Sequence, residues 1–267
     1  MKPKKSLCLT QQGFTVIEVM LSVAISALML IGVISGVYIS INQQRYNDAL
    51  RDFAEYVRTV YSEVISPQSF GLGNSPDKAV LGKVLVFGLE NDPSIVYSAT
   101  LVGNANYPAT GSAAEGFIDS LTNNNSIISL VCGDSSSNQG STKDEYTTLW
   151  QTHLMQAKDT PPGSNPEKIF KGTMIIARSL TSATIHTAFL NDVTYDLKNK
   201  CQPDNHQIGN SFGQSLKDQK ANYDTEHDVG ICVKMDGNSV SREVRIAADG
   251  RNTSAIKIMD EKDSKCR

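Results

Sequence analysis

The chain has 267 residues, a formal net charge of −3 and 40% hydrophobic residues. This apolar content permits a folded core, whereas the slight excess of acidic residues is unlike the basic face that nucleic-acid-binding proteins usually show. A nucleic-acid partner is therefore not expected, although small basic patches leave it open.

A nearly uninterrupted apolar stretch runs from Phe14 to Ile41 and follows a leader that contains Lys2, Lys4 and Lys5. About 20 apolar residues are enough for a helix to span a membrane. A cleaved secretory signal would have only about 7–15 apolar residues and a small-residue cleavage site. We therefore expect a retained membrane helix. The lysines should stay in the cytoplasm, which places the bulk of the chain outside.

One acidic residue, Glu18, lies near the start of this stretch. A carboxylate at the centre of a membrane helix costs roughly 2.5 to 3.5 kcal/mol on insertion scales, so this residue calls for a partner and indicates a function. A carboxylate in the first helical turn also complements the positive end of the helix dipole.

The segment QQGFTVIEVMLSVAIS, residues 11–26, resembles the prepilin signature of type IV pilins and type II secretion pseudopilins. In that family a dedicated peptidase cuts after the glycine on the cytoplasmic face and methylates the new amino terminus. The resemblance implies a leader of residues 1–13, cleavage between Gly13 and Phe14, and N-methylation of Phe14. Loss of the three leader lysines would change the formal net charge from −3 to −6.

The resemblance also implies a role for Glu18, which in the family is thought to pair with the amine of a neighbouring subunit during assembly. Cleavage frees an α-amine with a pKa of about 7.7–8.0, which is largely protonated near neutrality. An acid that cannot be satisfied alone in lipid would then favour polymerisation. The alternative, that Glu18 pairs only with its own terminus, stays open.

Beyond the apolar stretch, apolar residues recur at helical spacing and charged residues fill the other positions. We predict that residues 42–66 form the amphipathic half of the same helix, which ends before Pro67. Within the apolar half, Gly32 and Gly36 form a G-x-x-x-G pattern, which indicates either a helix-packing face or a place where the helix loosens. The apolar positions of the second half are Tyr46, Ala49, Leu50, Phe53, Tyr56, Val57, Val60, Tyr61 and Val64.

Residues 67–267 are predicted to form one extracytoplasmic, β-rich head with long polar loops, of which the longest runs over 199–228. Asp-Gly pairs at 236–237 and 249–250 are strong hairpin signals. The expected fold class is α+β, with an antiparallel sheet packed on the amphipathic half of the helix. The strand-like runs are 79–88, 94–102, 126–132, 172–180, 183–190, 229–235, 240–248 and 254–259.

Four cysteines remain once Cys8 leaves with the leader: Cys132, Cys201, Cys232 and Cys266. An even number in an extracytoplasmic domain predicts two disulfides, and sequence cannot choose among the three pairings. Cys201 with Cys232 would close the long polar loop and leave Cys132 for Cys266. The rival pairing joins Cys232 to Cys266. Zinc is not expected, because no cysteine pair has C-x₂₋₄-C spacing.

No catalytic motif and no phosphate-binding glycine loop is found, so neither enzyme activity nor a cofactor is expected. Asp224, Glu226 and Asp228 alternate somewhat like the acids of a calcium loop, as some pseudopilins have near the C-terminus. They lack the full spacing and a terminal glutamate, which makes them a weak calcium candidate.

The resemblance implies a structural subunit of a type IV pilus-like filament, which serves adhesion, motility or DNA uptake. The large head allows a minor subunit, and a major subunit with a large head stays open. It would sit in the cytoplasmic membrane before assembly and in an extracellular filament afterwards. Its partners would be other pilin subunits, the prepilin peptidase, the membrane, a platform protein with an assembly ATPase, and a surface or host-cell receptor. The alternatives are a type II secretion pseudopilin and a membrane-anchored binding protein or enzyme with a pilin-like anchor.

Overall fold

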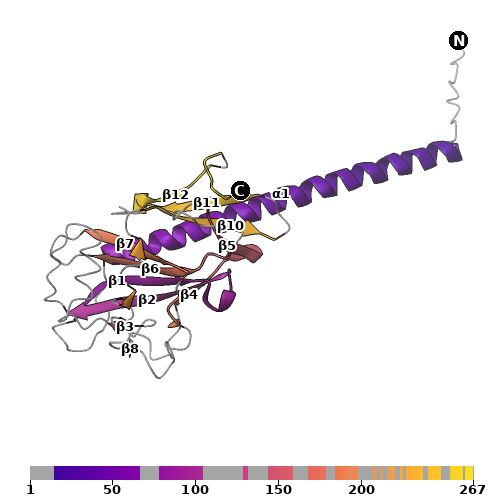
Figure 1. Cartoon of the computed structure of the whole chain (residues 1–267). Coiled ribbons are helices and arrows are strands. Elements are labelled where there is room, and N and C mark those ends of the chain that lie inside the picture. Colours follow the sequence, from indigo (N-terminus) through magenta and orange to yellow (C-terminus); the bar gives the residue numbers. More distant parts are fainter. Residues whose placement is uncertain are drawn as a thin grey trace, which may run out of the picture. The chain divides into compact units, whose positions relative to one another are not determined.

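In the residues that it describes, the computed structural model contains a long helix and two antiparallel sheets (Figure 1). It divides into two compact units, the first ending at Arg45 and the second beginning at Tyr46. The residues that the structure describes are 15–66, 78–104, 129–131, 144–158, 168–178, 184–192, 194–197, 207–208, 212, 216, 218–219, 223–224, 227–236, 240–247, 253–260 and 262–266.

Helix α1 (Val16–Ile65) supplies the first unit and the start of the second. In the first unit, every residue from Thr15 to Ile41 is exposed. In the second unit, the apolar stripe predicted from helical spacing is buried, except that Tyr56 is only half-buried. The helical periodicity therefore identified the face of α1 that packs into the head.

The larger sheet, sheet A, follows the strand order β8-β3-β2-β1-β6-β7-β9 among the described residues, and β4 also pairs with β2. All of its pairings are antiparallel. Its strands are β1 (Lys78–Phe87), β2 (Ile95–Asn104), β3 (Ser129–Val131), β4 (Asp144–Thr147), β6 (Gly172–Arg178), β7 (Ile185–Asn191), β8 (Gln207–Ile208) and β9 (Tyr223–Asp224).

The smaller sheet, sheet B, has the order β12-β11-β10-β5 in the described part of the chain and is also antiparallel. Short 3₁₀ turns η1 (Leu89–Asn91) and η2 (Leu149–Gln151) precede β2 and β5, and η4 (Thr253–Ala255) precedes β12. The strands of sheet B are β5 (Thr152–Gln156), β10 (Val229–Met235), β11 (Ser241–Ile246) and β12 (Ile256–Ile258).

The main core forms where α1 meets one face of each sheet. It joins Phe53 and Tyr61 of the helix to Phe87 and Phe189 of sheet A and to Ile231 of sheet B. Because side chains alternate across a strand, each sheet contributes every second residue to this core. Several polar contacts hold the far end of the helix against sheet A, among them the two that follow. The Tyr61 hydroxyl lies 2.6 Å from the Thr187 hydroxyl, and Glu63 pairs with Lys83 at 2.7 Å.

A second core covers the opposite face of sheet A. Tyr195, Leu197, Phe212 and Leu216 pack there against strand residues such as Val84. Two of these residues, Phe212 and Leu216, lie within the stretch 199–228 that was expected to be a polar loop, and both are almost completely buried. That expectation was therefore wrong for these two positions, because sheet A needs cover on both of its apolar faces.

The predicted α+β class and the packing of the helix on antiparallel sheet are confirmed, but the head contains two sheets where one was expected. The strands on either side of both predicted Asp-Gly turns, β10 with β11 and β11 with β12, are antiparallel neighbours. Strands β4, β5, β8 and β9 were not predicted. They are two to five residues long. They form strands because they pair with longer strands, and not because of their local sequence pattern.

Candidate functional site

The start of α1 is organised by a reciprocal contact between Thr15 and Glu18. The Glu18 Oε2 atom accepts the backbone N–H of Thr15 at 3.3 Å and lies 3.4 Å from its hydroxyl, while the Glu18 N–H donates to Thr15 Oγ1 at 3.3 Å. This is a capping box, in which the N-cap and N3 residues satisfy each other's free N–H groups. The carboxylate therefore points back toward the start of the helix. Gly13 and Phe14, the predicted cleavage pair, lie outside the described residues.

The helix that follows exposes an unusually large apolar surface. Val16 is 75% exposed and Ile17 is 79% exposed, and large apolar side chains stay exposed as far as Ile41. By length and composition, this helix is suited to cross a membrane. A soluble monomer rarely exposes an apolar patch of this extent, so the surface requires lipid or other apolar helices around it.

Two serines on this surface already satisfy their hydroxyl groups within the helix. Ser26 donates to the carbonyl of Ser22 at 2.8 Å, and Ser35 donates to the carbonyl of Ile31 at 2.9 Å. In lipid an unsatisfied polar group costs several kcal/mol, so these internal bonds make the surface compatible with an apolar environment.

Gly32 and Gly36, the predicted packing or loosening pair, lie inside continuous α-helix. A Cβ atom built at either glycine would meet nothing within 4 Å. No contact in the described part of the chain therefore requires glycine at these two positions. Contact with another helix and local loosening of α1 both stay predictions.

Within the head, one polar contact ties α1 to β4. The Tyr146 hydroxyl donates to Asp52 Oδ2 at 2.8 Å, and the Tyr146 ring stacks on Tyr56 with centroids 4.2 Å apart. Burial raises the pKa of Tyr146 above its ordinary value, and the hydrogen bond to the Asp52 carboxylate raises it further. The hydroxyl therefore remains a donor to Asp52 at physiological pH.

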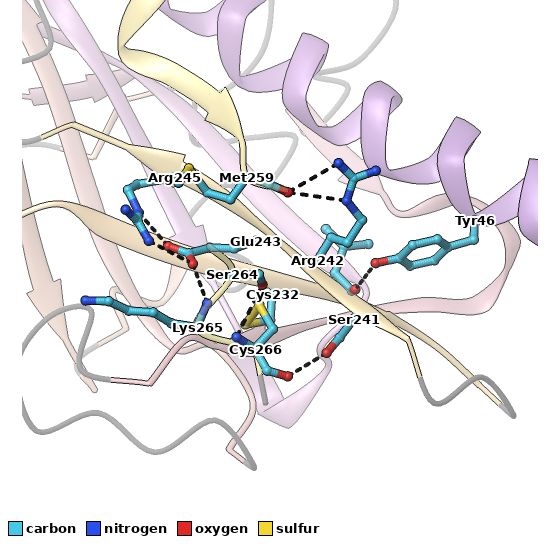
Figure 2. Close-up of a disulfide and its surroundings, with 11 residues drawn as sticks. Tyr46, Cys232, Ser241, Arg242, Glu243, Arg245, Met259, Ser264, Lys265 and Cys266 are labelled. Atoms are coloured by element: carbon cyan, nitrogen blue, oxygen red, sulfur yellow. Dashed lines mark hydrogen bonds and ion pairs between the residues drawn. A yellow bond between two sulfur atoms is a disulfide. The ribbon is translucent and has the colours of Figure 1, made fainter. Parts of the chain in front are cut away.

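The last residues of the chain are held on the face of sheet B that lies opposite α1, in an arrangement we call the C-terminal clasp (Cys232, Ser241, Glu243, Arg245, Lys265 and Cys266; Figure 2). The Cys232–Cys266 disulfide joins β10 to the tail. Beside it, the Ser241 hydroxyl donates to the Cys266 carbonyl at 2.6 Å.

An ion pair between a buried carboxylate and a half-buried guanidinium completes the clasp. The Glu243 side chain is fully buried, and its two oxygens accept from Arg245 Nε at 2.7 Å and Nη2 at 3.0 Å. The backbone N–H of Lys265 donates to the same carboxylate at 2.8 Å. The pKa of Arg245 is raised, chiefly by its hydrogen bonds to Glu243. The clasp therefore combines a covalent link with a charge-assisted one.

The disulfide decides one point that the sequence left open. Cys232 is bonded to Cys266, so its pairing with Cys201 is wrong and the rival pairing is the one formed. The tail reaches Cys232 because β11 and β12 carry the chain back beside β10 and Lys265 then binds Glu243. Cys132 and Cys201 lie outside the described residues.

The weak calcium candidate has no support in the described part of the chain, where no group of three His, Cys, Asp or Glu side chains could hold a metal ion. Asp224 instead accepts hydrogen bonds from His227, from its backbone N–H at 3.0 Å and from its ring. Asp228 is exposed, and Glu226 lies outside the described residues.

Sequence reasoning missed two of these features. The capping box was visible as Thr15-Val16-Ile17-Glu18, the T-x-x-E pattern that precedes an apolar run. Glu243 left no such signal, because a charged residue in an alternating strand ordinarily faces solvent.

Comparison with known proteins adds one finding. The prokaryotic N-terminal methylation motif matches residues 8–34. No curated protein and no solved structure matches the chain. The matched residues contain the glycine, the acid and the start of the exposed apolar helix described above. The chain therefore carries the prepilin-type cleavage and methylation signature of the type IV pilin and pseudopilin family.

Proposed function

We propose that this protein is a structural subunit of a type IV pilus-like filament that serves adhesion, motility or DNA uptake. It is made as a prepilin, cleaved after Gly13, N-methylated at Phe14 and polymerised through the apolar half of α1. The observation that carries the proposal is the exposed apolar surface from Val16 to Ile41, which begins at the methylation motif.

This surface needs two environments in succession. Before assembly, lipid covers it, because the stretch is long enough to span a bilayer. After assembly, the equivalent helices of neighbouring subunits cover it in the filament core. On this proposal, residues 1–13 are the leader, 14–41 the membrane or filament-core helix, 42–66 its amphipathic half and 67–267 the head. The head then forms the filament surface.

Glu18 supplies the electrostatic part of assembly. In the uncut chain its carboxylate accepts from Thr15 at the helix start. Cleavage before Phe14 creates an ammonium group on Phe14, the residue next to Thr15. A carboxylate in an apolar surrounding is stable only with such a partner. We propose that the Glu18 carboxylate binds the amine of a neighbouring subunit when the helices come together.

The partners of the proposed function are a prepilin peptidase, further pilin subunits, and a membrane platform protein with its assembly ATPase. A type II secretion pseudopilin uses the same chemistry without a long surface fibre, so location distinguishes the two. An anchored binding protein would use the helix only to stay in the membrane and would not depend on Glu18.

The first experiment shears filaments from cells and determines the mass of the N-terminal peptide of this protein. A peptide that begins at N-methylated Phe14 in the sheared fraction supports the proposal. The same peptide confined to the membrane fraction favours a pseudopilin, and an intact leader in both fractions contradicts processing.

Variants of Glu18 test the assembly step. Glu18→Ala should leave processing intact and abolish incorporation into filaments, whereas Glu18→Asp should retain part of the incorporation because it keeps the charge. Normal incorporation of Glu18→Ala would contradict the pairing role and favour a simple anchor.

A further inference from the structure

Most of the exposed large apolar side chains that the structure describes in the head lie at one end of sheet B. In the second unit, the described residues of this kind are Ile65, Leu149, Trp150 and Val240, which are 38%, 40%, 47% and 37% exposed. Leu149 and Trp150 belong to η2, directly before β5, and Val240 directly precedes β11. Three of the four therefore lie at the starts of two strands of sheet B.

Strand register places these two strand starts at the same end of β10. Thr152 of β5 pairs with Met235, and Ser241 of β11 pairs with Lys234. We call this end of sheet B, with η2 and Val240, the entry edge. It lies at the Tyr46 end of α1, because the Tyr46 hydroxyl donates to the carbonyl of Val233 at 3.1 Å.

The opposite end of sheet B lies further along the helix. Arg58 Nη2 donates to the carbonyl of Ile256 at 3.1 Å, and Ile256 is in register with Ile246 and, through it, with Val229 at the start of β10. Strand β10 thus runs from the Arg58 level of α1 to the Tyr46 level. The entry edge is the part of sheet B nearest to the point where the chain enters the head.

The chain itself limits how far this edge can be from a membrane. Tyr46 follows Ile41, the last residue of the apolar stretch, by five residues. Five residues span at most about 18 Å even when fully extended. The headgroup layer on each side of the hydrocarbon core is roughly 5–8 Å thick. Tyr46, whose hydroxyl donates to Val233 in sheet B, therefore lies within that reach of the end of the apolar stretch.

The turn that carries Trp150 is held in a sparsely populated conformation. Trp150 and Gln151 have φ values of 57° and 56°, a left-handed region that bulky residues rarely adopt. Hydrogen bonds hold it there: Thr148 Oγ1 donates to the Thr152 carbonyl at 2.5 Å, and Thr152 Oγ1 donates to the Leu149 carbonyl at 2.8 Å.

A third bond fixes this turn to the neighbouring hairpin of sheet A, because the Thr148 N–H donates to the carbonyl of Ser94 at 2.8 Å. The result is a rigid presentation of Leu149 and Trp150 at the surface. Residues held in strained conformations cluster at functional positions, where the surrounding structure maintains them.

We propose that the entry edge contacts the membrane that carries the apolar helix, with Leu149, Trp150 and Val240 in the extracytoplasmic headgroup layer of the unassembled subunit. Tryptophan is enriched at membrane–water interfaces because its ring is apolar while its N–H stays in a polar surrounding. This contact would orient the head on the membrane before assembly. The inference rests on the membrane anchorage of the proposed function.

Trp150 is the single tryptophan of the chain, so its fluorescence reports on this edge alone. The full-length protein is reconstituted in phosphatidylcholine–phosphatidylglycerol vesicles that contain phosphatidylcholine brominated at a shallow or a deep acyl position. We expect blue-shifted emission that both lipids quench, the shallow one more strongly.

A matched control moves the tryptophan to the other end of the head. The variant Trp150→Phe/Ile65→Trp places it at Ile65, an exposed apolar position whose carbonyl accepts from Arg178 at 2.9 Å. We expect that neither brominated lipid quenches the emission of this variant. Equal quenching of both proteins, or no quenching of Trp150, would overturn the inference.

Two further readings separate the causes of failure. If the protein does not float with the vesicles, the membrane anchorage of the proposed function fails. If it floats and Trp150 is unquenched, only the lipid contact fails. Protection of Trp150 from acrylamide in sheared filaments, without quenching in vesicles, would assign the entry edge to contact between subunits and overturn the lipid assignment.

Discussion

The fully buried carboxylate of Glu243 accepts the backbone N–H of Lys265 at 2.8 Å, and so holds the tail of the chain on sheet B. The same carboxylate binds the guanidinium of Arg245 through two hydrogen bonds. One side chain thus connects two residues of a strand to a segment about 20 residues later in the chain. Together with the Cys232–Cys266 disulfide, this contact makes the tail part of the folded head.

Glu243→Ala should lower the free energy of unfolding of the head by about 3 kcal/mol, because it leaves a half-buried guanidinium and a backbone N–H without their partner. Urea unfolding in detergent measures this. The matched control is Glu55→Ala, which removes the exposed pair with Arg58 and should cost less than about 1 kcal/mol. Equal effects of the two variants would contradict the role of the clasp.

The disulfides give a prediction about pairing. A digest under non-reducing conditions should contain a peptide that links Cys232 to Cys266. On the proposal that Cys8 is removed with the leader, Cys132 and Cys201 remain, and we propose that they form the second bridge. A peptide linking Cys201 to Cys232 would contradict the structure.

The Cys232–Cys266 bridge closes a segment with a sequence separation of 34. In the chain-entropy model, the double variant Cys232→Ser/Cys266→Ser should lose about 3–4 kcal/mol of stability. Cleavage at Gly13 should be unaffected, because the signature and the head are separate units. Thermal unfolding measures the loss of stability, and the mass of the N-terminal peptide shows whether cleavage is unchanged.

Tyr61 makes the head sensitive to alkali. Burial raises its pKa from 10.0 to about 12, against the opposing effect of its hydrogen bond to Thr187. The unfolded chain therefore releases this proton from about pH 10, while the folded chain keeps it until about pH 12. We therefore expect the free energy of unfolding to keep its full contribution from Tyr61 below pH 10 and to fall by about 3 kcal/mol as the pH rises from 10 to 12.

Tyr61→Phe separates this effect from other causes of alkaline unfolding. The variant should be about 1 kcal/mol less stable at pH 8, because the hydrogen bond is lost. It should then lose less stability than the parent between pH 10 and pH 12. Parallel pH profiles of the two proteins would show that Tyr61 does not titrate in this range.

Two glycine substitutions should behave in opposite ways. A Cβ at Gly82 would lie 2.1 Å from the carbonyl oxygen of Ile176, so Gly82→Ala should destabilise the β1–β6 pairing by several kcal/mol. A Cβ at Gly36 meets nothing within 4 Å. Gly36→Ala should therefore leave membrane insertion and processing unchanged.

If Gly36 packs against a neighbouring helix, the same variant should reduce the yield of sheared filaments. The free energy of unfolding of the head tests Gly82→Ala, and the yield of sheared filaments tests Gly36→Ala. Filament yield unchanged in both Gly32→Ala and Gly36→Ala would remove the packing role.

Gly13→Ile tests the cleavage site. A protease must bring the backbone close at the cut, and glycine has no side chain to prevent this. The variant should accumulate in the membrane as an uncut precursor with an intact leader, which immunoblotting and N-terminal mass determination detect. Normal trimming would refute the assignment, and Gly36→Ala serves as the control for a glycine change outside the site.

Much of the N-terminal site could be predicted, because its signals are contiguous in the chain. The basic leader, the glycine and the apolar stretch with Glu18 need no tertiary contact to be recognised. The helix predicted over 14–66, in its apolar and amphipathic halves, agrees with α1 at Val16–Ile65, since helical periodicity is a local property. The strands rich in β-branched residues were found for the same reason.

The head was harder to predict, because its short elements exist only through their partners. Strand β4, with the sequence Asp-Glu-Tyr-Thr, is a strand because it pairs with β2, and its Tyr146 is placed by Asp52 from the helix. Phe212 and Leu216 lie in a polar stretch, yet both are buried because sheet A exposes a second apolar face. The local composition of these segments indicates neither the strand with which β4 pairs nor the sheet face that Phe212 and Leu216 cover.

The amino-acid sequence by itself determined the signature, the apolar span and the face of α1 that enters the core, since each depends on residues within a few helical turns. Only the tertiary structure decided that Cys232 bonds to Cys266 and that Glu243 is buried. It also decided that Leu149, Trp150 and Val240 lie at the same end of sheet B. Those outcomes depend on which strands pair and in which register. Local turn signals indicated the β10–β11 and β11–β12 hairpins, but no local pattern encodes a long-range pairing such as that of β5 with β10.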